Sequence, residues 1–162
     1  MNQPLRPRVV LLNPPSDHIA IRDNFCSKIS QAAYINHPID LVIQSGYLAS
    51  AFTLHLLDAI IAPLTPDACL KRLIDIAPAA ILSLAGNATW PDDIAFFRRL
   101  RAALPTCRLV VSGDVFLEHP EDVLRMYPEI DAITSDFTGP GVLQYLTNPD
   151  QPAINMISRR SD

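Results

Sequence analysis

The chain has 162 residues, of which 49% are apolar and 19% charged, a composition that suits one globular domain with a buried core. Its net charge of −4, with lysines and arginines scattered along the sequence, argues against a nucleic acid partner. No apolar run reaches the roughly 18–20 residues that span a bilayer, and MNQPLRPR is too short and polar to introduce a signal sequence, so we expect a cytoplasmic protein with no membrane partner.

The first apolar run, VVLLNPP at 9–15, predicts a strand that is buried on both sides. It leads into a connection of about 25 residues, 14–38, which is far longer than the usual link in α/β units and is therefore expected to be functional. This connection carries His18, Arg22, Asp23, Cys26 and Lys28.

The next stretch, IDLVIQSGYLAS at 39–50, contains LVI, which favours a strand. We nevertheless expect a helix there, because two parallel strands need a crossover between them and FTLHLLD at 52–58 predicts the second strand. A clearer helix follows, with Thr65 as its N-cap and Pro66 at its first position. Its buried stripe comprises Leu70, Leu73, Ile74 and Ala77.

The third strand is predicted at AAILSLAGN, residues 79–87, and the helix after it begins between Thr89 and Pro91. That helix is expected to bury Phe97, Leu100 and Leu104 and to turn Arg98, Arg99 and Arg101 toward water.

The fourth and fifth strands are predicted at RLVVSGD, 108–114, and DAITSDFTG, 131–139, with a short helix between Pro120 and Pro128. A last helix follows Gly139 and buries Val142, Leu143 and Leu146. Residues 1–147 then form the domain, and 148–162, which have no periodicity, are interpreted as a linker or tail toward a further domain.

Alternating strands and helices of this kind predict an α/β, flavodoxin-like (Rossmann-like) three-layer sandwich with a five-stranded parallel sheet. The simplest strand order is 2-1-3-4-5, with its switch point between the first and third strands. Ligands of such sheets bind where the carboxyl ends of the strands meet, and small or polar residues follow the strands there. The candidate binding residues are Asn13, Pro14, Pro15, Ser83, Gly86, Asn87, Ser112, Gly113, Asp114, Asp136 and Thr138.

Several common sites are not indicated. The sequence has no GxGxxG or GxxxxGK[ST] phosphate motif, and a phospho-acceptor receiver would need acidic residues where Asn13-Pro14-Pro15 stands. The cysteines are too far apart for a CxxC pair and are expected to be reduced. The histidines lack metal-binding spacing, and no partner can be placed for Cys26 as a nucleophile, so no catalytic residue is expected.

Six segments together resemble the N-terminal cobalamin-binding domain of radical S-adenosylmethionine enzymes: RDNFCS, HPIDLVIQSGYL, LLDAI, AGNATWPDDIAFFRRLR, SGDVF and DAITSDFT. The resemblance covers roughly residues 8–147. It implies that cobalamin lies over the carboxyl edge and that the nucleotide tail enters at the switch point. S-adenosylmethionine and a 4Fe-4S cluster would then belong to a downstream domain, because this chain has no CxxxCxxC motif.

The resemblance further implies where each candidate residue lies. The loop after Asn13 would lie beneath the corrin, residues 83–87 and 112–114 would line the tail groove, and Asp136 and Thr138 would close its far side. The DxHxxG motif, which supplies a lower cobalt ligand in the wider group, is missing, because Asp17 and His18 are adjacent and no glycine follows at the required place. We therefore expect no imidazole below the cobalt, with His18 as the alternative ligand.

The resemblance thus implies the cobalamin-binding module of a radical S-adenosylmethionine enzyme, with methyl transfer as the overall reaction and no catalysis by this chain alone. Two other hypotheses stay open. The strand-end edge could bind a protein partner without catalysis, or the chain could be a small flavodoxin-like protein that binds flavin or a nucleotide.

Overall fold

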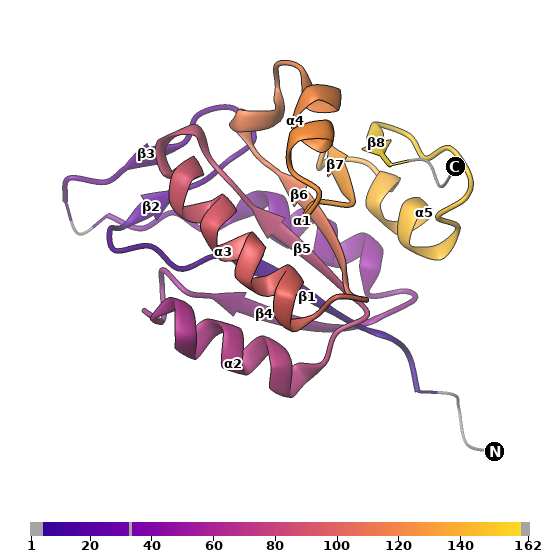
Figure 1. Ribbon diagram of the computed structural model, residues 1–162, viewed down its shortest axis with the longest axis horizontal. Helices are drawn as coiled ribbons and strands as arrows, with labels where there is room; N and C mark the ends of the chain where they lie inside the picture. Colours follow the sequence, from indigo (N-terminus) through magenta and orange to yellow (C-terminus); the bar gives the residue numbers. More distant parts are fainter. Residues whose placement is uncertain (1–4, 33, 160–162) are drawn as a thin grey trace.

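A computed structural model of the chain describes residues 5–32 and 34–159 (Figure 1). Eight strands and five α-helices are described, with one 3₁₀ turn before α3 and another before α4. The strands are β1 Arg8–Asn13, β2 Ala20–Ile21, β3 Lys28–Ile29, β4 Thr53–Asp58, β5 Ala80–Leu84, β6 Arg108–Ser112, β7 Ala132–Thr134 and β8 Met156–Ser158. The helices are α1 Ile39–Leu48, α2 Pro66–Ile76, α3 Trp90–Ala103, α4 Pro120–Met126 and α5 Gly141–Thr147.

The main sheet has the order β4-β1-β5-β6-β7-β8. Its first five strands are parallel, and in chain order they read 2-1-3-4-5, so the predicted flavodoxin-like fold is confirmed. The carboxyl ends of these five strands therefore lie at one edge of the sheet, the left edge in Figure 1. We call it the carboxyl edge.

The predicted strand count of five was too low, because β8 adds a sixth strand antiparallel to β7. This strand lies inside the segment 148–162 that we interpreted as a linker, whose residues 160–162 fall outside the described part of the chain. The guanidinium of Arg159 helps to hold the segment, since it donates to the backbone oxygens of Leu124, Tyr127 and Ile130. A three-residue strand flanked by turns has too few residues to show a period of two.

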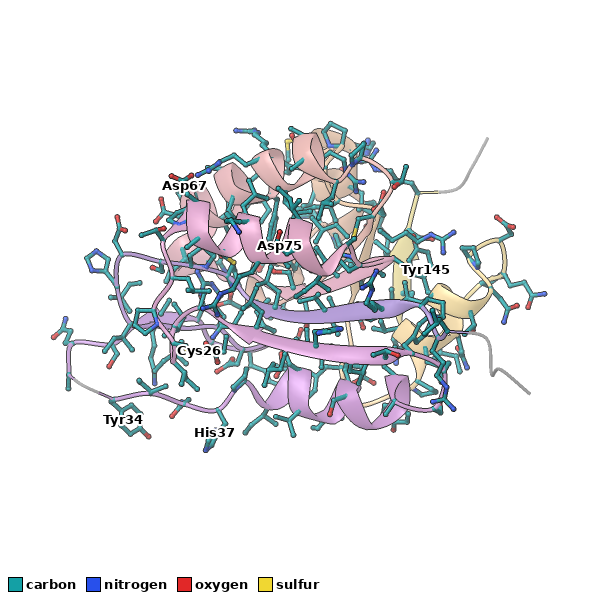
Figure 2. All side chains as sticks on the ribbon, turned by 90° about the horizontal axis from the view of Figure 1, so that it is seen from below. Cys26, Tyr34, His37, Asp67, Asp75 and Tyr145 are labelled. Carbon is teal, nitrogen blue, oxygen red and sulfur yellow. The ribbon has the colours of Figure 1, made fainter. Side chains whose placement is uncertain are left out.

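Alternate residues of each central strand face two separate cores. Val10 and Leu12 of β1 pack toward α2, α3 and α4, whereas Val9 and Leu11 pack toward α1 and α5. Figure 2 shows α1 on one side of the sheet with α2 and α3 on the other, so the predicted three layers are present. Burial on both faces explains why these strands are continuous apolar runs without alternating polar residues.

The predicted helices are also present, but Ile74 and Ala77 of the stripe predicted to be buried on α2 are exposed, and Cys69 is buried with Leu73 in their place. The region 39–50 forms α1, and the hydroxyl oxygen of Thr65 caps α2 by accepting from the amide of Ala68. One prediction on α3 was wrong, because Arg101 does not simply face water. Its half-buried guanidinium donates to the backbone oxygens of Pro105, Cys107 and Glu129, and it pairs with Asp131 at 2.5 Å.

No helix in the described ranges is both long enough and apolar enough to cross a lipid bilayer.

Candidate functional site

The carboxyl edge begins at the paired ends of β1 and β4. Asn13 and Asp58 are register partners, and the amide of Asn13 donates to the Asp58 carboxylate at 3.1 Å. The same Asp58 oxygen accepts from the backbone amides of Ile60 and Ile61, so it closes the turn after β4. Asn13 is buried, and the polar groups of its side chain form hydrogen bonds with neighbouring side chains at this edge.

A buried arginine ties the long connection 14–38 to the sheet. The guanidinium of Arg22 donates to Asn13 Oδ1 and to the backbone oxygen of Pro14, both at 3.0 Å. It also forms a two-point ion pair with Asp93, with Nη2 to Oδ1 at 2.7 Å and Nε to Oδ2 at 3.2 Å. Both side chains of this pair are fully buried. Because a buried charge without a partner is costly, the pair fixes this part of the connection over the switch point between β1 and β5.

Asp93 is the centre of the same network on α3. Its Oδ2 accepts from the hydroxyl of Thr89 at 2.7 Å and from the amide of Gly86 at 3.1 Å. Burial raises the pKa of Asp93, and the Arg22 guanidinium, the Thr89 hydroxyl and the Gly86 amide oppose that rise. The first turn of α3 is thereby joined to the end of β5 and to the long connection.

The ends of β5 and β6 are covered by residues 23–27 of the long connection. The Asp114 carboxylate accepts from the amide of Ser27 at 2.7 Å and from that of Asn87 at 2.9 Å. The Ser27 hydroxyl oxygen accepts from the amide of Ala88 at 3.0 Å. Segment 23–27 is thus bonded to both strand ends.

Two of the candidate glycines are required by this internal packing. A Cβ atom at Gly86 would lie 2.5 Å from the Cβ of Ser27. Gly113 has φ of +148°, and a Cβ there would lie 1.7 Å from the backbone oxygen of Ala85. A side chain is therefore excluded at both positions by the chain itself.

The structure brings the candidate residues of β5 and β6 together, and four of the six are buried. The Ser83 hydroxyl is buried and donates to the backbone oxygen of Leu84, and the buried Ser112 hydroxyl lies 3.5 Å from Asn24 Oδ1. Asn87 is the exposed residue among these candidates and Asp114 is half-buried. Asn87 and Asp114, two of the residues expected to line the tail groove, border a hollow beside Phe25 of segment 23–27.

The remaining candidates follow β1 and β7. Pro14 and Pro15 are buried directly after β1. Asp136 and Thr138 lie after β7, where Asp136 Oδ1 accepts from both the amide and the hydroxyl of Thr138. These two bonds lower the pKa of Asp136. Its other oxygen accepts from the side-chain amide of Asn155, so the carboxylate stabilises its own loop.

An open cavity of about 340 Å³ lies at the end of β1, beside the start of α1. Of the candidate residues only Asn13 lines it, and the rest of its wall comes from the long connection and the first residues of α1. The lining residues are Asn13, Ala20, Ile21, Arg22, Asp23, Asn36, His37, Pro38 and Ile39. A cavity of this size encloses a small group or one end of a larger ligand.

A second hollow of about 470 Å³ lies outside the ends of β5 and β6. Its walls are Phe25, Asn87, Asp114, Val115, Leu117, Glu118 and His119. Segment 22–25 contributes to both hollows, with Arg22 and Asp23 in the first and Phe25 in the second.

Apolar side chains are exposed around these hollows. Phe25 is 74% exposed, Ile39 60% and Leu117 51%. Further exposed apolar residues of the same region are Ile29, Tyr34, Ile35 and Val42. Figure 2 shows that Cys26, Tyr34 and His37 lie at the same end of the molecule. Exposed apolar side chains gathered around a cavity mark a surface for a ligand or a partner.

Sequence reasoning did not select the cavity-lining residues Asn36, His37 and Ile39. The signal that pointed to them was the length of the connection 14–38, which brings polar and apolar side chains back over the edge. His18, the alternative cobalt ligand, is exposed and is not among the residues that line the cavity. Its backbone amide donates to the Ser16 hydroxyl oxygen.

The three cysteines are free thiols, with Cys26 exposed and Cys69 and Cys107 buried. Burial raises the pKa of both buried thiols to about 12, so neither forms a thiolate nucleophile near neutral pH. Within residues 5–32 and 34–159, no group of three histidine, cysteine or acidic side chains is placed to hold a metal ion.

No family model matches the chain, and no curated protein matches it. Two solved structures have a similar fold. The cobalamin-dependent S-adenosylmethionine radical enzyme OxsB, with aqua-cobalamin and S-adenosylmethionine bound, superposes with a TM-score of 0.68 over 93% of this chain at 15% identity. The apo form of OxsB gives a TM-score of 0.64 over 87% of this chain at 18% identity.

This chain spans about a fifth of the length of OxsB, 20% in one structure and 18% in the other. At such low identity the similarity establishes a shared fold, and this chain superposes on one part of OxsB.

Proposed function

We propose that this chain binds cobalamin at the carboxyl edge of its sheet and is the cobalamin-binding module of a radical S-adenosylmethionine enzyme. Methyl transfer is the overall reaction we propose. The observation that supports this most is the similarity in fold, over 93% of the chain, to a cobalamin-dependent enzyme of that class. The sequence resemblance points to the same class through residues spread from 22 to 138.

The residues at the carboxyl edge suit a large, flat, amide-edged ring such as the corrin. Exposed Phe25, Ile39 and Leu117 offer an apolar bed, while Asn36 and Asn87 offer amide groups at the two hollows. Apolar contact area with a few convergent polar groups is the usual composition of a cofactor site. The cavity beside Asn13 would hold one part of the ligand, and the main face of the ring would lie outside it.

The roles of the residues would then differ from those expected from the sequence. Ile39, Asn36 and His37 would contact the ligand, whereas Gly86, Gly113 and Ser112 would support the edge from within. Arg22 and Asp93 would hold the bed rigid, because their buried ion pair fixes the connection that carries Phe25. When bound, cobalamin would supply a cobalt centre that carries the methyl group.

The wider domain arrangement belongs to the same proposal. Residues 1–147 form the cobalamin-binding domain, and 148–162 lead toward a downstream domain while contributing β8 to the sheet. S-adenosylmethionine and the 4Fe-4S cluster would be bound by that downstream domain.

Reconstitution tests the proposal. The purified chain is incubated separately with hydroxocobalamin and with flavin mononucleotide, desalted, and examined by visible absorption. The proposal predicts a retained corrin spectrum with hydroxocobalamin and no retained flavin. A colourless protein after desalting would contradict cobalamin binding and favour a protein-interaction domain, and a retained yellow flavin would favour the flavodoxin-like alternative.

A further inference from the structure

Two buried oxygen atoms on α1 have no hydrogen-bond partner among the described residues: Asp40 Oδ2 and Gln44 Oε1. Asp40 is 3% exposed and Gln44 is fully buried. Their positions differ by four residues, so both side chains lie on the same face of the helix, one turn apart. Each atom can only accept while Asp40 is ionised, and two neighbouring buried acceptors without a donor are unfavourable.

The nitrogen of the Gln44 side-chain amide already donates two hydrogen bonds. It donates to the backbone oxygens of Phe137 at 2.5 Å and of Gly139 at 2.9 Å, which fixes the amide with Oε1 on its other side. Glutamine cannot exchange its two amide atoms here without losing both bonds. Oε1 therefore needs a donor from elsewhere, and its neighbour one turn back is a carboxyl group.

We infer that at mildly acidic pH Asp40 holds a proton in the folded chain and donates it from Oδ2 to Gln44 Oε1, which locks two loops of the carboxyl edge onto α1. One proton satisfies both unpartnered atoms. The inference does not depend on cobalamin binding, because it concerns only side chains of this chain.

The two loops in question are the segment 22–25 and the loop 136–139 after β7. Gln44 holds the second loop through two backbone oxygens, and the Tyr47 hydroxyl adds a third bond to Thr138 at 2.8 Å. The first loop contacts the second through Phe25 and Phe137, whose rings meet edge to face with centroids 6.3 Å apart. A change at the Asp40–Gln44 pair therefore reaches both loops.

The charged groups around Asp40 favour its neutral form. The pKa of Asp40 is raised to about 6, mainly by burial and secondly by the nearby carboxylate of Asp23. The backbone amides of Asp40 and Asn24 partly oppose this. Arg22 of the same segment is already paired with Asp93.

Asp23 is the charged neighbour that acts on Asp40, and the described residues of the other elements packed against α1 add acidic and phenol groups here. The loop after β7 carries Asp136, whose carboxylate accepts from Thr138 and Asn155. The titratable side chain of α5 is Tyr145, whose pKa is raised by burial, so its phenol is neutral near pH 7. Ionisation of Asp40 would thus place a second negative charge beside Asp23 and leave Gln44 without a donor. We expect the lock to weaken as the pH rises through the range where Asp40 titrates.

The experiment follows carbon NMR of the Asp40 carboxyl and proton–nitrogen NMR of the Gln44 side-chain amide in the unmodified, unliganded chain between about pH 3 and pH 8. The inference predicts that both signals change together, with a midpoint near pH 6 in place of the ordinary value of 3.8. A carboxyl that titrates near its ordinary value, or a Gln44 amide that does not respond to it, would overturn the inference.

A variant provides a second test. Asp40→Asn keeps a donor at this position without the charge, so the Gln44 amide signal should lose its pH response. Asp75→Asn is the matched control, because Asp75 is an exposed helical aspartate on α2, and it should leave the response unchanged. A pH response retained in Asp40→Asn would contradict the assignment of the proton to Asp40. The NMR titration of the unmodified chain decides the matter even if the variant does not fold.

Discussion

Arg22 Nη2 lies 2.7 Å from Asp93 Oδ1, and the two residues are 71 positions apart in the sequence. This ion pair joins the long connection after β1 to the first turn of α3 and is completely removed from water. It places the segment that covers the ends of β5 and β6, and so determines which parts of the carboxyl edge stay open to a ligand.

Removal of one partner should therefore be costly. We expect Arg22→Met to destabilise the chain by about 3–5 kcal/mol, because Asp93 would keep a buried charge without its cation. Urea unfolding followed by circular dichroism measures this. Lys71→Met is the control, since Lys71 and Asp75 form an exposed pair whose loss should cost less than about 1 kcal/mol. Equal effects of the two substitutions would show that the buried pair has no special importance.

Two glycines provide a matched pair of substitutions. Gly113→Ala should destabilise the chain by more than about 2 kcal/mol, because φ is +148° and the new Cβ would overlap the backbone oxygen of Ala85. Gly46→Ala should stabilise it by about 0.5–1 kcal/mol, because Gly46 lies within α1 and a Cβ there meets no atom within 4 Å. Thermal unfolding of both variants checks this, and the same sign of change in both would contradict the backbone described here.

The stability of the chain should depend on pH through Asp40. Its folded pKa of about 6 lies above the ordinary value of 3.8, so the folded state binds the proton more tightly than the unfolded state. The stability that this proton contributes is full below about pH 4 and is lost as the pH rises through about 6, by no more than about 3 kcal/mol. In Asp40→Asn this part of the pH dependence should be absent. Urea unfolding midpoints of both proteins, measured at about pH 4, 5, 6 and 7, would detect this loss of stability.

The central fold could be predicted from the sequence because strand burial and helix capping each leave a recognisable local pattern of residues. The run VVLL at 9–12 is apolar without interruption because both of its faces are covered, and Thr65-Pro66 marks a helix start by local hydrogen bonding alone. In contrast, β8 consists of three residues whose pairing depends on the free edge of β7. Arg101 was misjudged for a similar reason, since its partners Glu129 and Asp131 lie 28 and 30 residues away.

The candidate site was harder to predict than the fold. Parallel strands correctly indicated which residues share an edge, but not which of them would be covered. Ser27 lies against Gly86 in a connection that the Arg22–Asp93 pair holds to α3, a relationship that no spacing in the sequence reveals. The open cavity is instead lined by residues around His37 and Ile39, at the end of the connection whose length had indicated a functional role.

A substitution in the cavity should separate ligand binding from folding. Ile39 is an exposed residue that lines the cavity, so Ile39→Glu should weaken hydroxocobalamin binding at least about tenfold by placing a charge against the apolar bed, with little change in stability. Ile74→Glu is the control, because Ile74 is 46% exposed on α2, far from the carboxyl edge in the fold. Fluorescence quenching titrations give both dissociation constants, and equal affinities would place the ligand elsewhere.

Substitution of histidines tests the ligation of the metal. Neither imidazole of His18 or His37 is held by a hydrogen bond among the described residues, and a metal-binding histidine is normally oriented by one. We therefore expect the visible spectrum of bound cobalamin to be the same in His18→Ala, in His37→Ala and in the unmodified chain. A shifted spectrum in one variant would identify that side chain as a cobalt ligand.

The central claim is that one cobalamin binds at the carboxyl edge of this chain, and its cobalt content tests this most directly. After incubation with hydroxocobalamin and gel filtration, elemental analysis should find about one cobalt atom per chain, and Ile39→Glu should retain markedly less. A protein peak free of cobalt, or equal retention by the unmodified chain and Ile39→Glu, would contradict the account.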